Sequence, residues 1–88
     1  MTKKEIIELF GIMRTAWPNA EPFRSGDMKA LEPTVLLWAN AAADMDFRIG
    51  QMALLELVKT SRFPPTVAEF REAAALVRAR RDSMQNQM

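Results

Sequence analysis

The sequence has 88 residues, of which 49% are hydrophobic and 26% charged, and its formal net charge is +1 at pH 7. This composition is typical of one small globular domain, and it excludes a disordered chain and the strongly basic character of many nucleic-acid-binding proteins. Cysteine and histidine are absent, which excludes disulfides, thiolate metal sites and the commonest general base.

Other missing features narrow the function further. Glycine occurs at only 3 positions, too few for a phosphate-binding loop. No apolar run approaches the roughly 20 residues that a membrane-spanning helix needs. Glu5 and Glu8 interrupt the apolar region that a signal peptide would need. We therefore expect a cytoplasmic protein that is not an enzyme and that binds no cofactor, metal ion or membrane.

The first predicted helix covers residues 3–16. Thr2 and Glu5 have the spacing of a capping box at its start, and Pro18 ends it. Gly11 lies inside this helix, where glycine is unfavourable, so we expect another backbone segment to pass close to it. The apolar side of the helix has the three- and four-residue spacing of a buried face: Ile6, Phe10, Met13 and Trp17.

A loop is predicted over residues 17–26, where prolines and turn-forming residues gather. It is long for a connection between two helices of a bundle. Large aromatic side chains usually spend their area in a core, so Trp17 and Phe23 are expected to anchor this loop rather than to bind a ligand.

The start of the second helix leaves two alternatives. Asp27 can cap a helix, but Pro33 is unfavourable in a helix interior. Either a short turn over residues 27–31 precedes a helix over 33–43 with Pro33 in its first turn, or one longer helix is kinked there. The first alternative is preferred, with Glu32 near the N-cap. The apolar face of this helix would consist of Leu31, Val35, Trp38 and Ala42.

The third predicted helix covers residues 46–60. Asp46 can cap its start, and Lys59 suits the negative pole of the helix dipole at its end. Asp44 and Asp46 form a carboxylate pair, but two loop carboxylates alone are weak evidence for a magnesium site. The expected apolar residues are Phe47, Gly50, Leu54 and Leu57 on one side, with Met52, Leu55 and Val58 beside them.

A rigid corner follows the third helix. Pro64 and Pro65 prevent a continuous helix, because each fixes φ and lacks a backbone donor. Thr66 and Glu69 then form a second capping box, and Phe70 can pack on Pro65. The apolar face of the fourth helix would consist of Val67, Phe70, Ala74 and Val77.

These patterns predict an all-α fold, since no strand or hairpin signal occurs. We expect a compact bundle of four helices over residues 3–16, 33–43, 46–60 and 67–81. They would form a single domain of residues 1–81, followed by a short disordered C-terminal tail over residues 82–88.

Arginines gather near the end of the fourth helix. They are either a solvated helix end that the dipole favours, or a contact for an acidic protein surface or a phosphate backbone. No aromatic residue interleaves them, so base stacking is not indicated and direct nucleic-acid binding is not expected. Methionine in the tail adds a flexible apolar side chain. The candidate partner-binding residues are Arg71, Arg78, Arg80, Arg81 and Met84.

Four stretches are distinctive in combination: Met1–Glu5, Trp17-Pro18, Thr34–Trp38 and Thr60–Ala73. Together they resemble the N-terminal helical domain of the phage replicative-helicase loader and inhibitor family, over about residues 2–74. The second half of the chain carries the more specific part of the resemblance. Its structural signature consists of Trp17, Pro18, Trp38, Phe63, Pro64, Pro65, Thr66, Glu69 and Phe70.

The resemblance implies a small helical domain followed by a flexible C-terminal region. Proteins of this family bind the hexameric replicative helicase, hold it inactive and deliver it to an origin marked by a replisome-organiser protein, in the cytoplasm of a bacterial host cell. Their helicase contact lies largely in the C-terminal region. Three alternatives stay open for the chain end at Met88: a truncated form, a tail limited to residues 79–88, or a function that has drifted.

Other classes of function also stay open. A helix, a corner and a helix ending in Arg78–Arg81 resemble a helix-turn-helix, so the chain could be a small nucleic-acid-binding regulator. Two prolines and a long break are unlike the tight turn of that motif. A phage assembly adaptor is the third alternative.

Overall fold

The computed structural model describes residues 1–21, 23–24 and 28–86 and contains only helices and loops among them. In chain order these are α1 (Lys3–Ala16), the 3-10 turn η1 (Met28–Leu31), α2 (Glu32–Ala41), α3 (Phe47–Thr60) and α4 (Val67–Asn86). The predicted all-α fold with four α-helices is confirmed.

Two capping boxes fix where the first and last α-helices begin. The hydroxyl of Thr2 accepts from the amide of Glu5 at 3.2 Å, and the carboxylate of Glu5 accepts from the amide of Thr2 at 2.8 Å. Thr66 and Glu69 repeat this arrangement at 3.1 and 2.9 Å. Both predicted boxes are therefore confirmed, and they satisfy amides that a helix start otherwise leaves unpaired.

The second helix starts as the preferred alternative predicted. η1 ends at Leu31, and α2 begins at Glu32 with Pro33 in its first turn, where the missing backbone donor has no intrahelical acceptor to lose. The proposed cap at Asp27 lies outside the described residues. α2 ends at Ala41 rather than at residue 43, because the backbone of Ala42 leaves the helical region at φ −112° and ψ 21°.

α4 extends past its predicted boundary. It runs to Asn86 instead of ending at residue 81, so residues 82–86 of the expected tail are helical. No proline or glycine follows Pro65, and arginine, glutamine and methionine are good helix formers. Nothing in this segment therefore stops the helix locally. Residues 87–88 lie outside the described part of the chain.

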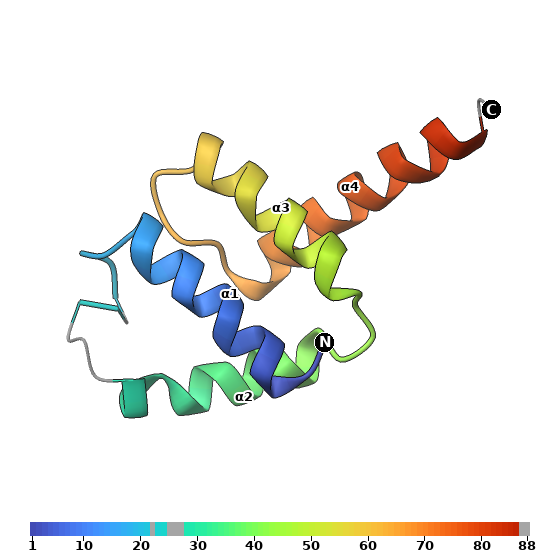
Figure 1. The fold of residues 1–88 in the computed structure, drawn as a ribbon. Coiled ribbons are helices and arrows are strands. Elements are labelled where there is room, and N and C mark those ends of the chain that lie inside the picture. Colours follow the sequence, from blue (N-terminus) through green and yellow to red (C-terminus); the bar gives the residue numbers. More distant parts are fainter. Residues whose placement is uncertain (22, 25–27, 87–88) are drawn as a thin grey trace.

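α1 lies between α2 and α3, while α4 packs mainly on α3 (Figure 1). Only the first half of α4 covers the bundle, and its second half projects away from the other helices toward the C-terminus (Figure 1). This projection makes the molecule elongated, with principal extents of 47 × 25 × 17 Å.

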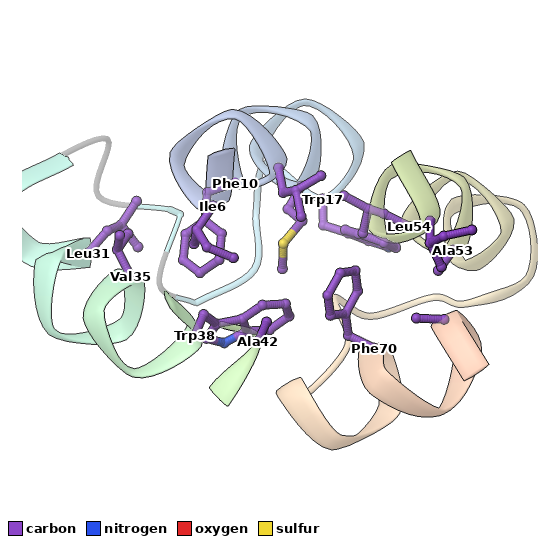
Figure 2. Packing of buried hydrophobic residues seen from close by; sticks show 14 of the residues in the cluster. Ile6, Phe10, Trp17, Leu31, Val35, Trp38, Ala42, Ala53, Leu54 and Phe70 are labelled. Atoms are coloured by element: carbon purple, nitrogen blue, oxygen red, sulfur yellow. The ribbon is translucent and has the colours of Figure 1, made fainter. Parts of the chain in front are cut away.

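One hydrophobic core joins the four α-helices. The rings of Phe10 and Trp38 lie 5.3 Å apart and those of Trp38 and Phe70 lie 5.2 Å apart, which links α1, α2 and α4 (Figure 2). Trp17 and Phe23 anchor the loop after α1, as expected: both are buried, and Phe23 meets Phe10 edge-on. The predicted faces supply most of the other buried residues, among them Ile6, Met13, Leu31, Val35, Ala42, Leu54, Ala74 and Val77.

Two details of the predicted faces are corrected. No atom outside its own helix lies within 4 Å of a Cβ built on Gly11, so no backbone passes close to it. On α3, Met52 and Leu55 are 52% and 48% exposed, and the buried positions beside Gly50 and Leu54 are Ile49 and Ala53. These four positions fall on one side of a helix, and its orientation is set where Asp46 accepts from the amide of Ile49 at 3.3 Å.

Candidate protein-interaction surface

The corner between α3 and α4 presents an aromatic ring to solvent. Ser61 Oγ accepts from the amide of Phe63 at 3.3 Å and donates to the carbonyl of Phe63 at 2.7 Å. The Phe63 side chain is 73% exposed, whereas Pro65 is buried under the start of α4. The ring of Phe63 is therefore available at the surface and adds nothing to the core.

Arg71, the first of the candidate partner-binding residues, is engaged within the molecule. Its Nη1 donates to Asp44 Oδ1 at 3.1 Å and to the carbonyl of Ala41 at 2.5 Å. The hydrogen bond from Arg71, together with its charge, lowers the pKa of the Asp44 carboxyl, and the same pair raises the pKa of the Arg71 guanidinium. Arg71 therefore ties α4 to the turn between α2 and α3.

Two more arginines lie on the same side of α4. Arg78 and Arg81 line an open hollow of about 440 Å³ beside Arg71. Carboxylates from the turn and from α4 line the same hollow, namely Asp44, Asp46 and Asp82. Positive and negative groups are thus mixed there, and the hollow lacks the surplus positive charge that attracts a phosphate backbone.

Arg80 lies on a different side of α4. Its Nη2 is 3.9 Å from Glu56 Oε1 of α3, at the edge of a second hollow of about 590 Å³ between the two helices. The lining of this hollow is mainly apolar: Leu57, Ala73, Leu76, Val77 and Ala79. The structure therefore brings Arg71, Arg78 and Arg81 together and separates Arg80 from them. The side chain of Met84 lies outside what the structure describes.

A comparison with protein families places these surfaces in context. The family model for the N-terminal domain of phage helicase loaders matches residues 1–71. The chain belongs to this family. Searches of curated proteins and of solved structures found no match. Membership in the loader family implies the role of a phage helicase loader, a class that is generally not enzymatic, and therefore an interaction with a helicase.

The match to the loader family divides the candidate surface. It includes α1, α2, α3, both capping boxes and the corner with Phe63, and it ends at Arg71. Arg78, Arg80 and Arg81 lie beyond it on the second half of α4. The part of the chain that matches the loader family thus carries a helical extension with most of the candidate residues.

Sequence reasoning missed the apolar part of this surface. Leu76 of α4 is 64% exposed at the second hollow, and Leu36 and Leu37 of α2 are 51% and 60% exposed. The signal was present in the spacing, because these leucines fall off the buried faces that Val35 and Val77 define. Within the described residues no cluster of three potential metal ligands occurs. No helix there is long and apolar enough to cross a membrane.

Proposed function

We propose that this chain binds the hexameric replicative helicase, inhibits it and delivers it to a phage origin through a replisome-organiser protein. The observation that carries the proposal is the match to the loader family over residues 1–71. The sequence holds no phosphate-binding loop, so the chain would act stoichiometrically rather than through an ATPase cycle of its own. It would favour one helicase state by binding it more tightly than another, since only differential affinity shifts such an equilibrium.

The second half of α4 is the helicase contact in this proposal. It projects from the bundle, and its arginines Arg78, Arg80 and Arg81 are exposed (Figure 1). A short helix without tertiary contacts is only marginally stable in water. A partner that packs on this segment would therefore stabilise it, and binding would be coupled to helix formation.

Light scattering after size exclusion tests the proposal, with the chain mixed with a hexameric replicative helicase in the presence and absence of ATP. We expect a stable complex whose amount depends on the nucleotide. Failure of the intact chain to form any complex would overturn the proposed function.

A deletion tests where the helicase binds. Removing residues 79–88 should abolish binding while the circular dichroism and melting of the bundle persist, because the core residues of α4 end at Val77. The matched control is Lys4→Ala, a change of one exposed charge on α1, which should bind as the intact chain does. If the shortened chain binds with unchanged affinity, the contact lies elsewhere on the domain.

A further inference from the structure

One face of α4 is exposed, apolar at its centre and charged on both sides. Leu76 is 64% exposed, although it borders the hollow between α3 and α4. Glu72 and Arg80 lie four residues before and four residues after it, which places all three side chains along one ridge of the helix. Glu72 has no ion-pair partner among the described residues, and Arg80 has only Glu56 at 3.9 Å.

We propose that this face binds a second copy of the chain, with the two α4 helices antiparallel across a two-fold axis at Leu76. Such an axis places each residue opposite one that is equally far from Leu76 in the other direction. Glu72 then lies opposite Arg80 of the second copy, and the pair occurs twice by symmetry. The charge pattern is therefore complementary to itself.

The small residues on this face agree with the same axis. Ala73 lies opposite Ala79 of the second copy, so the backbones can approach closely around the two leucines. A parallel arrangement would instead place Glu72 beside Glu72 and Arg80 beside Arg80, which like-charge repulsion disfavours. The pattern thus selects both the partner and the direction of the helices.

The projecting half of α4 gives this pairing a structural purpose. That segment has no other helix beside it within one molecule (Figure 1). In the dimer it lies along the first half of α4 of the second copy, which removes Leu76 from water. One helix pair buries less area than a standard interface of roughly 1,200–2,000 Å². We therefore expect a weak, reversible dimer, and Arg78 and Arg81 stay open because they lie on the side of the first hollow.

Sedimentation equilibrium of the intact chain over a wide concentration range gives the first test. A monomer–dimer equilibrium is expected, and a chain that stays monomeric at every concentration would overturn the proposal. Leu76→Ala should weaken the dimer at least about tenfold, because it removes the apolar centre of the interface. Leu37→Ala is the matched control, since Leu37 is similarly exposed at 60% on α2 and should leave the dimer unchanged.

Charge reversal gives the sharper test. Glu72→Arg and Arg80→Glu each place like charges opposite one another twice, so each variant alone should be monomeric. Mixed together they restore both opposite-charge pairs and should form a heterodimer, and the double variant E72R/R80E should dimerise with itself. Circular dichroism of every variant checks that the bundle is folded. Dimers that tolerate either single reversal, or variants that do not recombine, would exclude this axis.

Discussion

Gly50 of α3 lies against the end of the Phe70 ring of α4, so closely that a Cβ built on Gly50 would come 3.0 Å from Phe70 Cζ. The same Cβ would lie 3.0 Å from Met1 Cε. Phe70 is fully buried and also packs on Trp38, so its ring has no free space to move into. The close contact between α3 and α4 therefore depends on the absence of a side chain at Gly50.

Replacing Gly50 with alanine should destabilise the protein. Alanine gains up to ~1 kcal/mol of helix propensity, but overpacking a fixed core typically costs ~1–3 kcal/mol. We expect a net loss of about 1 kcal/mol in the free energy of unfolding, measured by urea denaturation. A more stable variant would show that the flexible end of Met1 and the ring of Phe70 can move aside.

Replacing Gly11 with alanine should have the opposite effect. Gly11 is exposed in the middle of α1, and an added Cβ would meet nothing within 4 Å. The gain in helix propensity should then appear in full, as ~0.5–1 kcal/mol of added stability in the same urea experiment. Since Gly11→Ala and Gly50→Ala change the chain by one methyl group each, equal effects would refute the packing argument.

Trp17 connects the end of α1 to the end of α3. Its indole Nε1 donates to the carbonyl of Ser61 at 3.3 Å. Trp17→Phe keeps a buried aromatic ring but leaves that carbonyl without this donor, so we expect a loss of ~1 kcal/mol in the free energy of unfolding. Thermal melting followed by circular dichroism measures it, and an unchanged melting temperature would mean that water replaces the indole at no cost.

The α-amino group of Met1 closes the end of α2. It donates to the carbonyls of Ala42, Ala43 and Met45 at 2.9, 3.2 and 2.8 Å. A glycine and a serine added before Met1 would remove this charged donor, and a hydrogen bond to a charged group contributes roughly 1.5–3 kcal/mol. Chemical denaturation should show a loss of about that size. The same two residues added after Met88 serve as the control and should change little.

The ion pair between Arg71 and Asp44 should make stability depend on pH in the acid range. Because the pKa of the Asp44 carboxyl is lowered in the folded protein, its ionised form favours folding. This contribution is present above the usual carboxyl pKa and is lost as the pH falls below about 4. Asp44→Asn should melt at a lower temperature than the unmodified chain at neutral pH and should lose less stability on acidification.

A control separates Asp44 from the capping box, because the pKa of Glu69 is also lowered, by its hydrogen bonds with Thr66. Glu69→Gln keeps an acceptor for the amide of Thr66 but does not ionise in this range. It should therefore flatten the acid dependence independently of Asp44→Asn. If Asp44→Asn has the same pH profile as the unmodified chain, the ion pair contributes nothing measurable.

The candidate surface was only partly predictable from the sequence. Clustering of Arg71, Arg78, Arg80 and Arg81 along the chain suggested one basic patch. The structure places Arg80 on a different side of the helix from Arg78 and Arg81, since neighbours along a helix point in different directions. The carboxylate of Asp44, which neutralises Arg71, lies 27 positions away in the chain and no local pattern indicates it.

Local sequence patterns were enough to show where two of the helices begin and which sides of the helices face inward. The boxes of Thr2 with Glu5 and of Thr66 with Glu69 act over three residues, and the period of an apolar helix face acts over three or four, so both can be read locally. Which faces meet depends on tertiary packing. The fit of Phe70 on Gly50 and the exposure of Leu76 follow from how α3 and α4 pack, and that packing is set by contacts between residues far apart in the chain.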